Sequence, residues 1–206
     1  MTRCFLCVAV LASVSLTVVA GCDFGSRRIR PPSVNAATAA QAAMKEYDAD
    51  GDGKIIGAEL DKCPALKSVA KAGDRKGIDP KGEGITAENL QAAIGQWQIR
   101  GVGRLTYSCM VLKNGQQLQK ATVKFVPEKF LGADYPVAIG TTNKEGAVAM
   151  SVPNVSPEGV AVGFYRVEIT KDGENIPAQY NTETTLGVGI IRSQPDGSIE
   201  VFNLKY

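Results

Sequence analysis

Histidine is absent from the 206 residues of this chain. Its absence excludes serine–histidine–aspartate and cysteine–histidine catalysis, together with every metal site that needs an imidazole ligand. Beyond the apolar N-terminal run, which holds Cys4 and Cys7, the cysteines show no CxxC spacing, and no block of like charge marks a surface for nucleic acid. An enzyme with this composition would depend on carboxylates, lysine, tyrosine or a bound ion. We therefore expect a protein without catalytic activity and without a nucleic-acid partner.

Charged residues are also missing from positions 4–20, which follow Arg3. A positive start, an apolar middle and a small-residue end are typical of a secretory signal peptide. This apolar run is close to the lower length limit for crossing a bilayer. An uncleaved transmembrane helix and an ordinary secretory signal are therefore the alternatives to a more specific interpretation of its end.

That end reads Val19-Ala20-Gly21-Cys22 and resembles the lipobox of bacterial lipoproteins, in which two small residues precede an acylated cysteine. The resemblance implies that residues 1–21 are a removed signal peptide and that Cys22 carries lipid. Residues 22–35 would then form a lipidated tether. Several acyl chains anchor a protein stably in a membrane. We expect a membrane-anchored lipoprotein of the cell envelope that faces the periplasm or the cell exterior, in an inner or outer membrane.

Two cysteines would remain in the body of the mature chain, Cys63 and Cys109. In an oxidising compartment they could form a disulfide. The sequence pattern assigns them to different domains, which favours buried free thiols instead.

The stretch DADGDGKIIGAE, residues 48–59, crowds acidic side chains onto one short loop. Carboxylates this close repel one another, so the sequence predicts a bound cation among them. The alternative is an acidic, glycine-rich turn without metal. The candidate ligands in this loop are Asp48, Asp50, Asp52, the main-chain carbonyl of Lys54, and Glu59.

This stretch resembles the twelve-residue calcium loop of the EF-hand family. The aspartates match positions 1, 3 and 5, Gly53 matches the turning position 6, and Glu59 matches the bidentate position 12. Ile56 at position 9 has no ligand atom, so a water would fill that place. The resemblance implies a calcium ion with seven oxygen ligands. Dockerin modules have similar loops but lack a full entering helix.

The flanking residues predict an EF-hand pair over 36–98. Asn35 is a candidate N-cap of the entering helix, and Pro64 interrupts the exiting one. Residues 78–90 resemble a second loop that is one residue short, and Thr86 is placed to cap the last helix. We expect a degenerate partner loop, with metal binding there as the alternative. The two loops would pair through a short β-bridge at Ile55 and Ile85.

Residues 102–206 alternate apolar and polar side chains between turn residues, which predicts strands. Seven runs at this spacing favour a seven-stranded antiparallel β-sandwich and, with the helices, a two-domain α+β chain. The runs are 103–112, 118–128, 136–143, 147–153, 164–172, 184–193 and 198–206. The motifs 113–115, 121–125 and 163–167 resemble the carboxypeptidase-regulatory-like, transthyretin-like sandwich. That resemblance implies an accessory module without an active site.

Two functions are open at this point. The first is a calcium-binding, lipid-anchored, non-enzymatic envelope protein in which calcium has a structural role. The second is an interaction or adhesion subunit of an envelope or transport complex that docks through the sandwich. For that second function we expect Phe130 and Tyr135 to be exposed on a loop, where aromatic side chains bind another envelope protein or a glycan.

Overall fold

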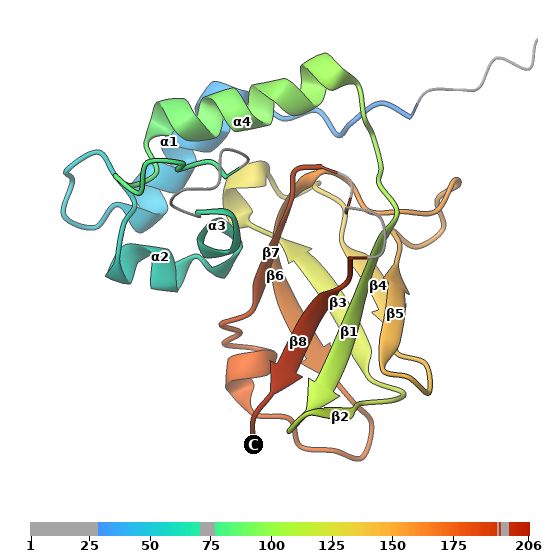
Figure 1. Cartoon of the computed structure of the whole chain (residues 1–206). Helices are drawn as coiled ribbons and strands as arrows, with labels where there is room; N and C mark the ends of the chain where they lie inside the picture. The colour runs from blue at the N-terminus through green and yellow to red at the C-terminus, as the bar shows by residue number, and fades with distance from the viewer. Residues whose placement is uncertain (1–28, 71–76, 193, 195–197) are drawn as a thin grey trace, which may run out of the picture.

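The computed structural model describes residues 29–70, 77–192, 194 and 198–206. The predicted signal peptide, Cys22 and the first part of the predicted tether lie outside these residues. The described chain is α+β: helices come first, and two packed β-sheets follow (Figure 1). None of the described helices has both the length and the hydropathy needed to cross a bilayer.

The two long helices begin at the residues that the sequence predicts. Helix α1 covers Ala36–Tyr47, and the Asn35 side chain accepts a hydrogen bond from the Thr38 amide at 3.0 Å. Helix α4 covers Ala87–Arg100, and Thr86 forms a reciprocal capping box at its start. These caps satisfy amides that the first helical turn leaves unpaired. Helices α1 and α4 pack against each other through their apolar faces (Figure 1).

Two short helices separate the long ones and bring the chain onto the sandwich. Helix α2 covers Ala58–Lys62, and helix α3 covers Pro64–Val69, so Pro64 divides the exiting helix as predicted. Helix α3 packs on strand β7, Gly187–Ile190. A Cβ added at Gly187 would overlap the carbonyl carbon of Pro64. Glycine at this position therefore lets the helix backbone lie directly on the strand.

The strands form two four-stranded sheets. In the first sheet β1 pairs with β2, β5 and β8; these strands cover Tyr107–Lys113, Gln116–Gln117, Ala147–Met150 and Glu200–Leu204. The second sheet has the order β4-β3-β6-β7; its other strands cover Ala138–Thr141, Thr122–Pro127 and Gly163–Thr170. Two 3₁₀ turns, η1 (Lys129–Leu131) and η2 (Ala178–Tyr180), complete the elements. The arrangement is consistent with a β-sandwich.

The prediction of seven antiparallel strands is wrong in two respects. Each predicted run contains a strand, but the short strand β2 adds an eighth. Strand β8 lies parallel to β1, with Cys109 opposite Glu200 and Lys113 opposite Leu204. Alternating apolar residues show which face of a strand is buried, but they carry no information about its direction.

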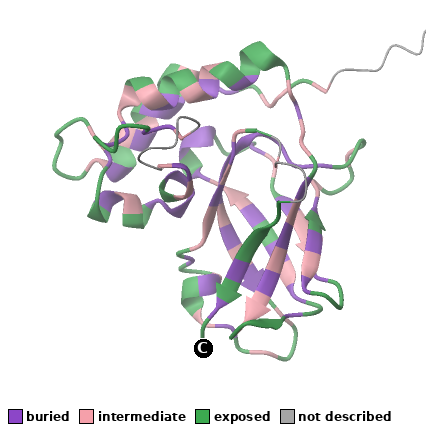
Figure 2. Ribbon diagram, in the orientation of Figure 1, coloured by how far each residue is buried: buried purple, intermediate pink, exposed green. Residues whose placement is uncertain are grey.

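The helices and the sandwich share one hydrophobic core (Figure 2). The ring of Trp97 on α4 lies 5.2 Å from that of Phe164 on β6. Tyr47 on α1 makes an edge contact of 6.4 Å with Phe130 on η1. Aromatic pairs at these distances stabilise a core beyond their buried area. The helical part is therefore packed directly on the sandwich.

The expected exposure of two aromatic side chains is wrong. Phe130 and Tyr135 are each only 6% exposed. Phe130 contacts Tyr47 and Phe164, and the Tyr135 hydroxyl donates a hydrogen bond to the Val162 carbonyl. Helix α1 covers Phe130 and strand β6 covers Tyr135, and tertiary contacts of this kind leave no local sequence pattern. The loop therefore gives no support to an aromatic surface for a glycan or another protein.

Candidate metal centre

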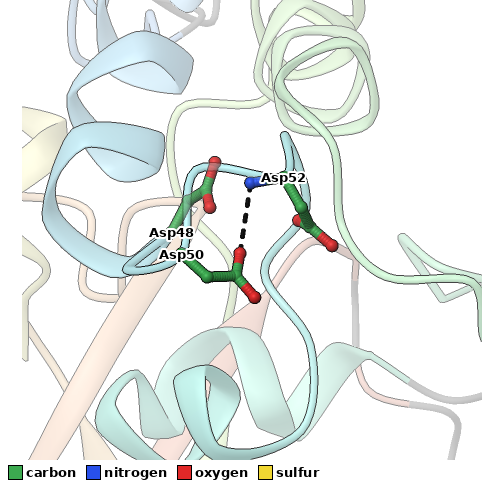
Figure 3. Close-up of side chains that lie close together, drawn as sticks. All are labelled: Asp48, Asp50 and Asp52. Atoms are coloured by element: carbon green, nitrogen blue, oxygen red, sulfur yellow. Dashed lines mark hydrogen bonds between the residues drawn. The ribbon is translucent and has the colours of Figure 1, made fainter.

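Three aspartate side chains converge within the loop that joins α1 to α2. Ligand oxygens of Asp48, Asp50 and Asp52 all lie within 4.8 Å of one another (Figure 3). Asp48 is half-buried, whereas Asp50 and Asp52 are exposed, and the loop projects away from the core (Figure 2). The structure thus brings together three of the predicted ligand residues.

Backbone amides hold these carboxylates in place. Asp48 accepts hydrogen bonds from the amides of Gly51 and Gly53 at 2.8 and 3.0 Å, one on each oxygen. Asp50 accepts one from the Asp52 amide at 3.1 Å (Figure 3). Asp52 in turn accepts one from the Lys54 amide at 2.8 Å. A carboxylate has about four lone-pair sites, so each retains acceptor capacity for a cation.

Glu59 closes the loop through hydrogen bonds to the backbone and is not one of the three converged carboxylates. One of its oxygens accepts hydrogen bonds from the amides of Ala49 and Asp50 at 2.6 and 3.4 Å. The other accepts one from the Ile56 amide at 3.2 Å. These bonds, with that from Ala49 the largest cause, lower the pKa of Glu59 below its ordinary value. Its side chain is therefore held as a carboxylate against Ala49 and Asp50 at the start of the loop.

Lys54, the predicted carbonyl ligand, is half-buried where the two loops meet. The stem of its side chain lies close to Gly84. A Cβ built on this glycine would be only 3.0 Å from the Lys54 Cβ. The methylene stem of Lys54 lies beside the second loop. It lines the contact between the loops rather than occupying a ligand position with its side chain.

The donor set is suited to a hard divalent cation. All three converged groups are carboxylate oxygens, which are the ligands that hard cations prefer. Oxygens that surround Ca²⁺ at about 2.3–2.6 Å can be at most about 4.6–5.2 Å apart. The three ligand oxygens lie within 4.8 Å of one another, a separation that one cation of this kind can bridge.

The second loop repeats the frame of the first with different residues. Asp79 stands in the place of Asp48: its carboxylate accepts amide hydrogen bonds from Gly82, Glu83 and Gly84 at 2.9–3.1 Å. Asp79 is only 7% exposed. Counted from this aspartate, the loop lacks the residue that corresponds to Lys54. The structure thus shows at which position the second loop is one residue shorter than the first.

The two loops pair as predicted. The amide of Ile55 donates to the carbonyl of Ile85 at 2.9 Å, and the amide of Ile85 donates to that of Ile55 at 3.1 Å. Both isoleucine side chains are fully buried. The correspondence continues past the bridge, because Asn89 accepts a hydrogen bond from the Thr86 amide as Glu59 does from that of Ile56. The bridge therefore fixes the position of one loop relative to the other.

The sequence did not predict the buried carboxylate of Glu128. Glu128 follows β3, is 1% exposed, and accepts a hydrogen bond from the Tyr47 hydroxyl at 3.0 Å. Burial is the main cause that raises the pKa of Glu128. Nothing in the local sequence distinguishes it from a solvated glutamate at the end of a strand, so its role depends on the tertiary structure.

The two described cysteines are buried free thiols, as expected. Burial raises the pKa of Cys63, and it raises the pKa of Cys109 to about 12. Nucleophilic cysteines have lowered pKa values and partial exposure. Neither thiol has the environment of a reactive cysteine.

Comparison with known proteins gives no match to a family model, to a curated protein or to a solved structure. The functional argument therefore depends on the residues and geometry of this chain.

Proposed function

We propose that the loop of residues 48–59 binds one calcium ion in the manner of an EF-hand, and that the ion has a structural role. The observation that carries the proposal is the convergence of Asp48, Asp50 and Asp52 within 4.8 Å of one another. Three carboxylates this close repel unless a cation offsets their charge. The pairing of this loop with a second one of the same frame gives further support.

Four side chains and one main-chain group would hold the ion. These ligands are Asp48, Asp50, Asp52, the carbonyl of Lys54, and Glu59 in bidentate contact, with a water beside Ile56. Bound calcium would offset the negative charge and link the start of the loop to its end. Since Asp48 follows α1 and Glu59 lies within α2, the ion would fix the angle between these helices.

The protein that carries this site would be a lipid-anchored, non-enzymatic component of the cell envelope. Support for the anchor is the sequence Val19-Ala20-Gly21-Cys22, with lipid on Cys22 after removal of residues 1–21. Support for the absence of catalysis is the lack of histidine and the raised pKa of both described thiols. The transthyretin-like resemblance of residues 102–206 agrees with an accessory module.

One observation favours the second candidate, an interaction subunit that docks through the sandwich. Among the described residues, β8 pairs with β1 alone. Ile199 and Val201 beside this edge are 38% and 47% exposed. Edge strands with exposed apolar side chains are common sites of protein association.

Isothermal titration of the processed protein tests the calcium site. We expect one ion per chain with a Kd on the order of 10⁻⁴ to 10⁻³ M, the range of extracellular calcium modules. Glu59→Gln should abolish the heat of binding. Glu83→Gln is the matched control, since Glu83 is an exposed acid of the second loop, and it should leave the titration unchanged. Absence of heat with the wild type, or equal heat with Glu59→Gln, would refute the proposal.

A further inference from the structure

Glu128 connects the sandwich to both helices that flank the metal loop. Its Oε2 accepts a hydrogen bond from the hydroxyl of Tyr47, the last residue of α1, at 3.0 Å. Its Oε1 accepts one from the thiol of Cys63, at the junction of α2 and α3, at 3.6 Å. Arg166 on β6 adds an ion-pair contact, with Nε 3.9 Å from Oε2. One carboxylate thus joins α1, the junction of α2 and α3, and β6 to the residue that follows β3.

The backbone of Glu128 is itself fixed in the sandwich. Its amide donates to the Phe164 carbonyl at 2.9 Å, and its carbonyl accepts from the Leu131 amide at 3.0 Å. The side chain is 1% exposed. A buried carboxylate that loses a hydrogen-bond donor has no water to replace it, so its partners are strongly held. Glu128 is therefore a rigid attachment point for the helices.

Both attachments lie close to residues of the proposed metal site. Tyr47 directly precedes Asp48, and the Asp48 amide still belongs to the last turn of α1 through its bond to the Met44 carbonyl at 2.9 Å. Cys63 lies four residues beyond Glu59, at the end of α2. The positions of the first and last carboxylates of the loop are therefore set by helices that Glu128 holds.

We propose that Glu128 is a positioning residue for calcium binding, acting through Tyr47 and Cys63 on the two ends of the loop. This inference rests on the proposed calcium site and adds a dependence on the sandwich. Loss of either contact would let a helix end shift. Calcium binding would then have to order the ligands, which would lower the affinity. By linkage, calcium would strengthen the attachment of both helices to the sandwich to the same degree.

Removal of the Tyr47 hydroxyl provides the test. In the processed protein, Tyr47→Phe should raise the calcium Kd by about fivefold or more, the lower end of coupling between sites. Tyr165→Phe is the matched control: this buried tyrosine donates to the Ala161 carbonyl at 2.9 Å within the sandwich. Both variants lose one buried hydroxyl, and urea unfolding without calcium measures what each loses in stability. We expect Tyr165→Phe to keep the wild-type Kd even where the losses of stability are equal.

A mutant cycle tests whether the effect passes through Glu128. In a Glu128→Gln background, Tyr47→Phe should change the Kd by less than it does in the wild type. Cys63→Ala tests the second contact independently and should also raise the Kd. Equal Kd values for Tyr47→Phe and Tyr165→Phe would overturn the positioning role while leaving the calcium site intact. A wild-type protein that binds no calcium would instead refute the site itself, and the inference with it.

Discussion

The two loops of the helical part share one frame and differ in what that frame can bind. Each begins with an aspartate that accepts amide hydrogen bonds from the glycines of its own turn. Each contributes one isoleucine to the bridge between Ile55 and Ile85. The first loop adds Asp50 and Asp52, whereas the second has Lys81 and Glu83 and one residue fewer.

The first aspartate of such a loop can have two roles, hydrogen bonding to the backbone of the loop and metal binding, and the two loops differ in which role it serves. In the second loop the aspartate is buried and its carboxylate is occupied by three amides, so it serves the backbone. In the first loop the aspartate is half-buried and faces two other carboxylates. The fold of the loop therefore depends on one acid, whereas metal binding depends on its neighbours and on a main-chain carbonyl.

Restoring the missing features should turn the second loop into a calcium site, which is the largest effect we expect. The variant carries one lysine inserted between Gly84 and Ile85, together with Lys81→Asp and Asn89→Glu. Glutamate at position 89 would preserve the capping box with Thr86. Titration calorimetry should then give two ions per chain instead of one. The two substitutions without the insertion should still give one ion, since the carbonyl ligand would remain missing. Two bound ions without the insertion would show that loop length is not the reason why the second loop binds no calcium.

Removal of the first aspartate should destabilise the protein more in the second loop than in the first. In the absence of calcium, Asp79→Ala should lower the free energy of unfolding by about 2–4 kcal/mol, because it leaves the buried Gly84 amide and the part-buried amides of Gly82 and Glu83 without their acceptor. Asp48→Ala should cost only about 1 kcal/mol, since its amide partners reach water. Urea unfolding in a chelator measures both values. A larger loss for Asp48→Ala would contradict the division of roles.

The smallest effect concerns the pH dependence of the two loop ends. The pKa of Glu59 in the folded protein lies below its ordinary value of 4.5. Between the two values the unfolded chain binds more protons, so the contribution of Glu59 to stability is present above about pH 4.5 and is lost as the pH falls. In calcium-free buffer Glu59→Gln should therefore flatten the acid limb of the stability curve. Asn89→Ala, at the matching place of the second loop, should shift the curve without changing its slope.

Local sequence predicted the parts of this fold that local physics determines. Asn35 and Thr86 begin helices because their side chains cap amides, and Pro64 divides a helix because it lacks an amide proton. The three converged aspartates follow from their spacing in one turn.

The features that the sequence did not predict are decided by distant partners. The parallel pairing of β8 depends on which sheet the last segment joins. Phe130 is buried between Tyr47 of α1 and Phe164 of β6, and Tyr135 is buried against Tyr165 of β6. The link from Glu128 to Tyr47 joins residues 81 positions apart in the chain. A single sequence contains no periodicity for contacts of this kind.

The parallel pairing of β1 with β8 has a consequence for folding. It joins the first and the last of the described strands, with Cys109 opposite Glu200. The helices and the second sheet can form their contacts without β8, but the first sheet keeps an open side until β8 docks. Contacts this far apart in sequence form slowly, and an unpaired strand is prone to association with other chains. Partly folded chains in which β8 is undocked should therefore be the species most prone to aggregate.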